Sequence, residues 1–309
     1  MTIPTIYVGC DISKATIDVF DPRSGRDLQV DNTEAAIAAF LAALDQTSSC
    51  LVFEATGRYD RTLRHLCDGA GLRFCRLNPV RVRRFAEATG RLAKTDSIDA
   101  RLLSRMGEMI EPKAETTVDA GRERLAALVR RRDQLVDMRS KQRQQAEAAG
   151  DPVVAEDIAS VCAFLDERIT AIEAEIKSQA SCDTNVARTI DRLRSAPGVG
   201  PVTASVLAAI LPELGITSPK RITALVGLAP YNDDSGPRKG QRHIKGGRAR
   251  ARHALYMAAL GAIRANKRFN DFYQALANRS GSKKLALTAV AHKLLVVLNA
   301  MQRDQKAFA

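Results

Sequence analysis

The hydrophobic pattern of this chain changes character twice along its 309 residues. Up to about Pro79, short β-branched or aromatic runs alternate with helical stretches, and turn residues such as Asp21-Pro22 and Ser24-Gly25 separate them. Strands are expected at 6–10, 15–20, 28–30, 51–54 and 72–77, and helices at 34–44 and 60–68. Three early strands joined by turns, then strand, helix and strand, predict an α/β domain. Its sheet should start antiparallel and become parallel through helical crossovers.

Beyond about Glu115 the strand signals stop. Two long, charged stretches, Arg122 to Ala148 and Val154 to Ala180, are separated by Gly150-Asp151-Pro152, where a chain would reverse direction. Each stretch carries one apolar stripe spaced by threes and fours, which favours an antiparallel helical hairpin or coiled coil. The stripe residues are Leu125, Leu128, Leu135 and Met138, then Ile158, Val161, Leu165, Ile169, Ile172 and Ile176. Such a stripe is more often a core or a dimer interface than a ligand site.

The last third of the chain is expected to be all-α. Because 309 residues are too many for one compact core, several domains are expected. The predicted division is an α/β domain at 1–118, a helical hairpin at 119–183 and a helical domain at 184–309.

The charge of the chain limits its partners. Lys and Arg outnumber Asp and Glu by 47 to 35, which gives a net charge of +12 and favours DNA, RNA or an anionic membrane as the partner. A basic protein without such a partner stays an alternative. We expect no apolar stretch that approaches the roughly 20 residues of a membrane span, and the N-terminus lacks a basic segment followed by an apolar one. The sequence therefore predicts a cytoplasmic protein without a membrane partner.

Four acidic residues in the first third, Asp11, Glu54, Asp96 and Asp99, stand out in this basic chain. Asp11 and Glu54 each close an apolar run, so both carboxylates are expected at the ends of buried strands. Asp96 and Asp99 are spaced so that a helix points both to one face. Carboxylates that converge from separate elements can hold two Mg²⁺ ions, which stabilise the attacking and leaving oxygens in phosphodiester chemistry. Helix caps and surface ion pairs are the alternative explanation.

Two further signals lie in the last third. The segment Pro197-Gly198-Val199-Gly200-Pro201 closes one helix and opens the next, so its free backbone N–H groups could hold a phosphate, or it is a tight turn. The segment 236–253 holds seven cations and no acid, which favours a surface for a phosphate backbone over a merely solvated face. These cations are Arg238, Lys239, Arg242, Lys245, Arg248, Arg250 and Arg252.

Five ordered motifs, which together span nearly the whole chain, carry a resemblance to a known family. They are Gly9-Cys10-Asp11-Ile12-Ser13-Lys14, Phe53-Glu54-Ala55-Thr56-Gly57, Lys94-Thr95-Asp96-Ser97-Ile98-Asp99-Ala100, Pro197-Gly198-Val199-Gly200-Pro201, and Gly227-Leu228-Ala229-Pro230 with Ser235-Gly236 and Lys239-Gly240. The first three resemble the RuvC-like catalytic motifs of the DEDD transposases, the insertion-sequence one-hundred-ten family. The last two resemble the C-terminal transposase domain of that family.

The resemblance implies a ribonuclease-H-like (RuvC-like) N-terminal domain in which Asp11, Glu54, Asp96 and Asp99 bind Mg²⁺. It also implies a coiled coil and an all-α C-terminal domain with a segment of helix-hairpin-helix type. The motif match makes Ser235 the nucleophile. A serine hydroxyl is weak at its ordinary pKa, but metal ions and neighbouring cations can favour the alkoxide.

A family member would act as a site-specific recombinase of a bacterial insertion sequence. It would cut and rejoin DNA through a covalent phosphoserine, guided by a bridge RNA that pairs with donor and target DNA, while the protein mainly grips backbones. Because the acids and the serine lie in different domains, we expect a composite site, completed in a homodimer or homotetramer.

Other function classes stay open on sequence grounds. A RuvC-like, metal-dependent, structure-selective endonuclease would use water in place of Ser235. A sugar kinase or chaperone-like ATPase also opens with a Gly-x-Asp-x-Ser strand turn, but it would need further glycine-rich phosphate loops. A non-catalytic binding protein is the third alternative.

Overall fold

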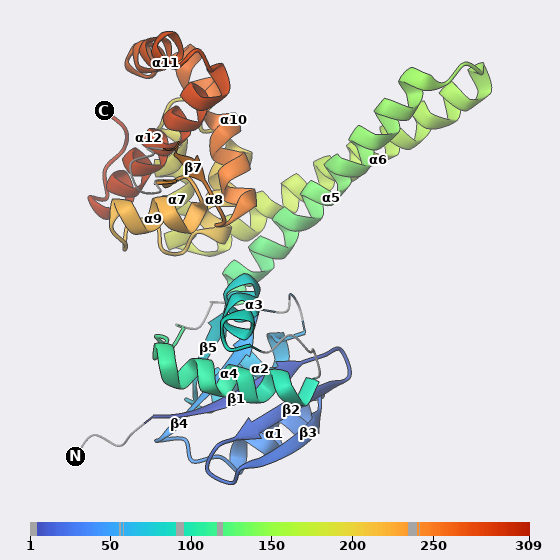
Figure 1. The fold of residues 1–309 in the computed structure, drawn as a ribbon. Helices are drawn as coiled ribbons and strands as arrows, with labels where there is room; N and C mark the ends of the chain where they lie inside the picture. Colours follow the sequence, from blue (N-terminus) through green and yellow to red (C-terminus); the bar gives the residue numbers. More distant parts are fainter. Residues whose placement is uncertain are drawn as a thin grey trace. The chain divides into compact units, whose positions relative to one another are not determined.

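The chain forms two compact units, Met1–Val118 and Asp119–Ala309 (Figure 1). A computed structural model describes residues 5–55, 57, 59–90, 96–115, 120–233, 240 and 242–309, with the backbone alone at 96–98. The boundary between the units coincides with the first predicted boundary. The second predicted boundary, at residue 183, falls inside the second unit and stays a prediction.

In the described part of the first unit, five strands form one mixed sheet in the order β3-β2-β1-β4-β5. The strands are β1 Ile6–Ile12, β2 Thr16–Asp21, β3 Arg26–Asp31, β4 Ser49–Glu54 and β5 Arg73–Leu77. The pairs β1–β2 and β2–β3 are antiparallel, whereas β1–β4 and β4–β5 are parallel. The predicted change from antiparallel to parallel pairing is confirmed, and the mixed sheet is compatible with a ribonuclease-H-like domain.

Helices cover both faces of this sheet, because alternate residues of the buried strands point to opposite sides. Val8 and Cys10 face α1 (Glu34–Ala42) and α2 (Arg61–Gly69). Tyr7 and Val52 face the opposite side, where α3 and α4 pack. The central strands are therefore apolar on both faces, as their continuous hydrophobic runs suggest.

Helix α3 (Pro79–Ala88) was not predicted from the sequence. It begins with a local signal: the side chain of Asn78 accepts a hydrogen bond from the backbone N–H of Val80, and Pro79 occupies the first turn. Only one residue of this helix, Val82, is fully buried, so the helix has almost no apolar stripe by which periodicity could reveal it. Helix α4 (Asp96–Ile110) follows and carries both predicted aspartates.

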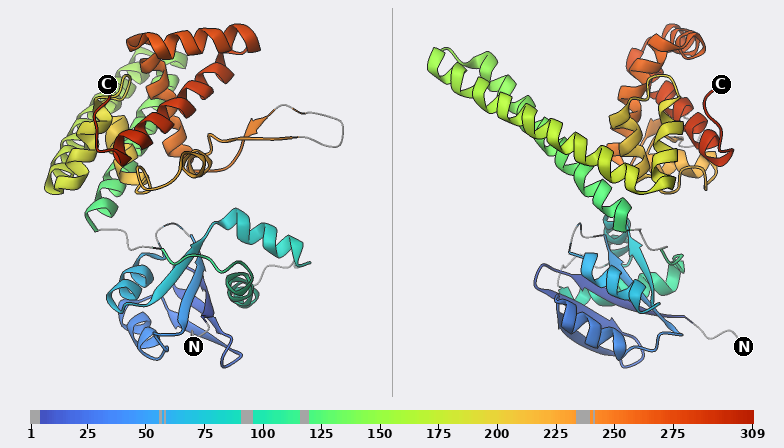
Figure 2. Two further views of the ribbon diagram at one scale, coloured as in Figure 1. Left: turned by 90° about the vertical axis from the view of Figure 1, so that its left-hand side faces the viewer. Right: turned by 180° about the vertical axis from the view of Figure 1, so that it is seen from behind.

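The second unit begins with the predicted helical hairpin, α5 (Ala120–Ala148) and α6 (Pro152–Cys182), which extends away from the other helices of that unit (Figure 2). Asp151 starts α6 by accepting hydrogen bonds from the backbone N–H groups of Val153 and Val154. Leu135, Leu165 and Ile169 form the apolar contact in the outer part of the hairpin. The physical basis of the hairpin is therefore the stripe that the sequence shows.

The stripe is narrower than the sequence predicts. The predicted stripe includes Met138 and Val161, but these residues are 49% and 36% exposed. On the opposite flank, ion pairs link the two helices: Arg132 Nε donates to Glu173 at 2.9 Å, and Arg139 pairs with Asp166. Heptad spacing alone cannot distinguish the seam from its flank.

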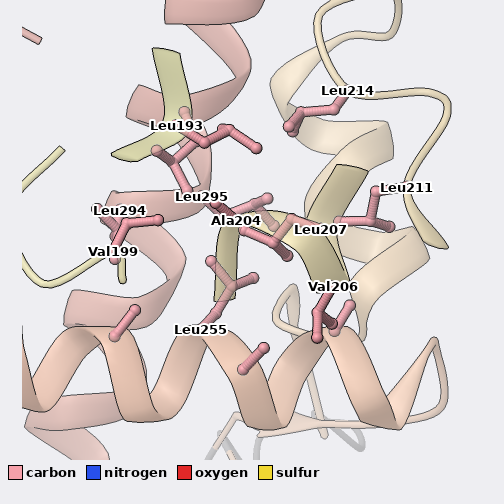
Figure 3. Packing of buried hydrophobic residues seen from close by; sticks show 14 of the residues in the cluster. Leu193, Val199, Ala204, Val206, Leu207, Leu211, Leu214, Leu255, Leu294 and Leu295 are labelled. Atoms are coloured by element: carbon pink, nitrogen blue, oxygen red, sulfur yellow. The ribbon is translucent and has the colours of Figure 1, made fainter. Parts of the chain in front are cut away.

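The remaining helices of the second unit form a bundle around one apolar core, part of which is shown in Figure 3. They are α7 Thr184–Arg194, α8 Pro201–Ile210, α9 Pro219–Val226, α10 Ala249–Ala265, α11 Lys267–Ser280 and α12 Lys283–Arg303. The expectation of an all-α domain is wrong in one detail, because β6 (Pro230–Tyr231) and β7 (His243–Ile244) pair as an antiparallel hairpin. These two-residue strands are exposed and show no apolar alternation that could reveal them.

Helix α12 corrects the expectation that no apolar stretch approaches the length of a membrane span. It has 21 residues and is long and apolar enough by composition, and 56% of its most apolar window is buried inside the protein. Leu294, Leu295 and Leu298 lie fully in the bundle core. Core packing therefore accounts for the composition of this helix.

Gly9 provides a test of how α4 is held on the sheet. A Cβ atom added there would lie 1.9 Å from the carbonyl oxygen of Ala100, so Gly9→Ala should lower the free energy of unfolding of the first unit by roughly 3 kcal/mol. Gly69→Ala is the matched control, because nothing lies within 4 Å of an added Cβ and alanine favours the helix. Denaturant unfolding followed by circular dichroism measures both. Equal stabilities of the two variants would contradict this packing.

Candidate active site

Asp11 and Glu54 lie side by side on one face of the sheet. The parallel register pairs Gly9 with Val52 and Cys10 with Phe53, so one further step along both strands brings Asp11 beside Glu54. Neighbouring strands are about 4.8 Å apart. Alternation from Tyr7 and Val52 places both carboxylates on the face that α3 and α4 cover. The structure thus brings together two acids that are far apart in sequence.

Helix α4 runs across this same face, in direct contact with β1. Ser104 Oγ donates a hydrogen bond of 2.7 Å to the carbonyl oxygen of Tyr7, and Ala100 lies against Gly9. The helix therefore runs antiparallel to the strand. From Gly9 to Asp11 the strand advances about 7 Å, and from Ala100 back to Asp96 the helix advances about 6 Å. The start of α4 is thereby brought level with Asp11.

The predicted pair Asp96 and Asp99 lies on the first turn of α4, and Asp99 is partly buried. The side chain of Asp96 lies outside the described residues. Among the side chains that are described, no group of three His, Cys, Asp or Glu residues is arranged to hold a metal ion. The geometry therefore places Asp11 and Glu54 on one face, on which the helix that carries Asp99 packs, and the set of four acids stays a prediction.

Arg101 anchors the first turns of α4 to the edge of the sheet. Its Nε and Nη2 atoms donate to the two carboxylate oxygens of Asp27 at 2.9 and 2.7 Å, and its guanidinium group lies 4.4 Å from the centre of the Phe20 ring. This bidentate pair and cation–π contact fix the orientation of the helix next to Asp99. Arg101, which follows the predicted acids in the sequence, is thus ion-paired with Asp27.

Asp18 is an acid on this face that sequence reasoning missed. The antiparallel register places it directly opposite Asp11, and its Oδ1 atom accepts a 2.9 Å hydrogen bond from Gln29. Like charges directly opposite each other in a sheet are destabilising, and a bound cation would offset that cost. The alternation of polar and apolar residues in β2 could have shown that the Asp18 side chain lies on the face away from the α1–α2 core.

The chemistry of these side chains fits a hard cation. Carboxylate oxygens are the ligands that Mg²⁺ prefers, and the nearby thiol does not compete. Cys10 faces the α1–α2 core, where burial first, and then Cys67 and Asp11, raise its pKa well above the ordinary value. Cys10 is therefore a neutral thiol and no thiolate ligand.

The predicted nucleophile Ser235 lies outside the described residues, as do Arg238 and Lys239. The described residues on both sides of the segment are close to each other, since a Cβ added to Gly240 would lie 2.2 Å from the carbonyl oxygen of Asp233. Tyr231 pairs with His243 at the base of this hairpin. The described flanks therefore form a narrow antiparallel ribbon.

The remaining predicted cations divide into two groups. Arg242 and Lys245 are exposed on and beside β7. Arg248 instead makes two bonds to the carboxylate of Glu213, at 2.6 and 2.7 Å, and Arg250 pairs with Asp133 of α5. Arg252 donates to the carbonyl oxygen of Gly246 at 2.6 Å. These three arginines hold α10 to its neighbours, which a basic run in a sequence cannot show.

The two glycines of the α7–α8 turn have different environments. Gly198 has a φ of +78° and packs on α10, where an added Cβ would lie 2.2 Å from the carbonyl oxygen of Ala258. Gly200 is the exposed N-cap of α8, and nothing lies within 4 Å of its Cβ position. Gly198 is therefore required by packing, and Gly200 lies where the first N–H groups of α8 are accessible.

Two models of known protein families match this chain. The IS110 model of DEDD type, described as "Transposase", matches residues 8–149, and a model described as "Transposase IS116/IS110/IS902 family" matches residues 190–274. Together they support a transposase of the IS110 family. The first match includes Asp11, Glu54, Asp96 and Asp99, and the second includes the α7–α8 turn and the basic run. An IS110-family transposase is an enzyme that cleaves and rejoins DNA.

Several curated proteins resemble this chain. The "Pilin gene-inverting protein" of Moraxella bovis is 26% identical over 98% of this chain and 97% of its own length, and that of Moraxella lacunata is 25% identical over the same shares. The "Insertion element IS116 uncharacterized 44.8 kDa protein" of Streptomyces clavuligerus is 33% identical over 49% of this chain and 38% of its own length.

The turn glycines allow packing and accessibility to be separated. Gly198→Ala should lower the free energy of unfolding of the second unit by roughly 2 kcal/mol or more, because it adds both a strained φ and a backbone clash. Gly200→Ala should change it by less than about 1 kcal/mol, the usual cost at an N-cap. Thermal unfolding of the two variants provides the comparison, and a larger loss for Gly200→Ala would refute the assignment.

Proposed function

We propose that this protein is a site-specific DNA recombinase of an insertion sequence, with a ribonuclease-H-like unit that binds Mg²⁺ and a nucleophilic serine in the second unit. Asp11, Glu54, Asp96 and Asp99 would hold the metal, and Ser235 would attack DNA. The observation that carries the proposal is the position of Asp11 and Glu54 on neighbouring strands, with the start of α4 brought level with them by its contact on Gly9.

The proposed acids have a positioning role in the reaction. Bound Mg²⁺ would supply Lewis-acid stabilisation of the phosphoryl oxygens. The sheet fixes Asp11 and Glu54, while α4, anchored by Arg101 on Asp27, would supply Asp99. Asp18, hydrogen-bonded to Gln29, would orient Asp11 or a water molecule from behind.

The proposed chemistry at Ser235 is a transesterification. An Oγ–P bond forms as the bond from phosphorus to a deoxyribose oxygen breaks, the serine proton leaves, and the departing oxygen takes up a proton. Attack by the hydroxyl group of another strand reverses the step and rejoins DNA, so the energy of the phosphodiester is conserved. Ser235 would lie between Asp233 and Gly240, on a ribbon whose described flanks carry the exposed cations Arg242 and Lys245.

The relatives favour recombination over simple hydrolysis. The printed name of the two Moraxella proteins refers to inversion of a gene, which requires cut strands to be rejoined. A hydrolytic endonuclease that uses water in place of Ser235 would not rejoin them. Since the Moraxella proteins and this chain align over almost their full lengths, the same class of reaction is the better proposal for this protein.

The proposed recombinase would also need a guide RNA and a second subunit. A bridge RNA would pair with donor and target DNA, and the protein, with its net charge of +12, would mainly hold backbones. Because the acids and Ser235 belong to different units, the proposed site is composite and is completed in a homodimer or homotetramer. The exposed apolar side chains of Val161 and Phe164 on α6 support association through the hairpin.

The serine mechanism predicts a covalent protein–DNA species. Incubation with labelled substrate DNA and Mg²⁺, followed by denaturing electrophoresis, should show labelled protein for the natural chain and for the control Ser178→Ala, an exposed serine on α6. Ser235→Ala should lose the band and lose strand exchange by about a hundredfold or more. Strand exchange by Ser235→Ala, or cleavage without a protein-linked product, would establish the water mechanism instead.

The metal assignment predicts a loss of cleavage without a loss of DNA binding. Asp11→Asn keeps the shape of the side chain but removes its charge, so Mg²⁺-dependent cleavage should fall by about a hundredfold or more. Binding of substrate DNA in EDTA should be unchanged or slightly tighter, because one negative charge is lost. Glu34→Gln, an exposed acid on α1, is the matched control. Undiminished cleavage by Asp11→Asn would contradict the site.

A further inference from the structure

A cavity of about 450 Å³ lies in the second unit, where the base of the α5–α6 hairpin meets the α7–α8 pair. Its volume is within the range of sites that bind small organic groups. The residues that line it come from all four helices. All of its lining residues belong to the second unit.

The floor of this cavity is apolar. Val129 of α5, Ile176 of α6, Ile190 of α7 and Val206 of α8 line it, and each also belongs to the buried core of the unit. The core therefore leaves a hollow with hydrophobic walls on four sides. Such walls favour a flat organic group over a hydrated ion.

One buried polar group opens into the hollow. Ser205 of α8 lines the cavity and is only 8% exposed. A serine hydroxyl can both donate and accept a hydrogen bond. At the wall of the cavity it can therefore bond to a ligand atom.

The side chains that line the cavity include three cations, Arg132, Lys177 and Arg194, and two acids, Glu173 and Asp191. Lys177 of α6 and Arg194 in the last turn of α7 are exposed at its edge, and Arg132 of α5 lies deeper, held by its 2.9 Å bond to Glu173. Val202, in the first turn of α8, also lines the cavity, and the N–H groups of a first helical turn have no partner within the helix. Cations and a helix start together favour an anionic group at the rim.

We infer that this cavity accepts one unstacked nucleotide of a single-stranded nucleic acid. The base lies against the apolar floor and the guanidinium plane of Arg132, within reach of the Ser205 hydroxyl, and the phosphate lies at the rim near Arg194 and Lys177. Bases splayed from a strand are recognised by stacking and by hydrogen bonds to their edges. The inference rests on nucleic acid as the substrate, and it does not depend on Ser235 or on a bound metal.

The test is binding of a short fluorescent oligonucleotide to the full chain in EDTA, measured by anisotropy, with single-stranded DNA and RNA of one sequence as separate arms. Arg194→Ala should weaken binding roughly tenfold in at least one arm. It should also lower the slope of the logarithm of the binding constant against the logarithm of the salt concentration by about one. Arg188→Ala is the matched control, because Arg188 is exposed on the same helix but does not line the cavity. It should change binding less than about twofold.

A second variant tests the cavity itself. Ala187→Phe fills it from α7, and it should weaken binding of the intact oligonucleotide about fivefold or more while leaving duplex DNA unaffected. Equal effects of Arg194→Ala and Arg188→Ala, or normal binding by a folded Ala187→Phe protein, would overturn the inference. The arm that responds identifies DNA or RNA as the source of the nucleotide. Because cleavage is not measured, a failed serine mechanism would leave these results unchanged.

Discussion

The contact between the backbone of α4 and Gly9 of β1 is the constraint on which the first unit depends. A helix can approach a strand this closely only where the strand has no side chain, and an added Cβ would meet the carbonyl oxygen of Ala100 at 1.9 Å. The Ser104 hydroxyl bonded to Tyr7 fixes the register of the contact. As a result the first turn of α4 lies level with Asp11, and acids from separate elements share one face.

In the second unit, ion pairs and glycine contacts fix the position of α10. Arg248 and Arg250 bind Glu213 and Asp133, and Gly198 packs directly on the helix. The basic run is therefore part scaffold and part surface. Its exposed members, Arg242 and Lys245, are available to a phosphate backbone, while the paired members hold the bundle from which the β6–β7 ribbon extends.

The proposed recombinase divides its tasks among these parts. In this proposal the sheet and α4 would place the carboxylates, the chain between β6 and β7 would supply Ser235, and the hairpin and bundle would offer surfaces for nucleic acid and for a second subunit. The matches to the IS110-family models and to the pilin gene-inverting proteins extend across both units. The cavity at the base of the hairpin adds a place where a strand could be held by one of its bases.

The sequence alone determined the five strands of the mixed sheet, the helices α1 and α2, the hairpin and the placement of Glu54 at a strand end, because these follow from local periodicity and turn chemistry. It did not reveal α3, β6 or β7. It could not determine which cations are paired, since Arg248 and Glu213, or Arg250 and Asp133, are far apart along the chain. Nor could it show Asp18 opposite Asp11, the exposure of Met138, or Ser205 at the wall of the cavity. Those features depend on register and on contacts between distant segments, which only the tertiary structure decides.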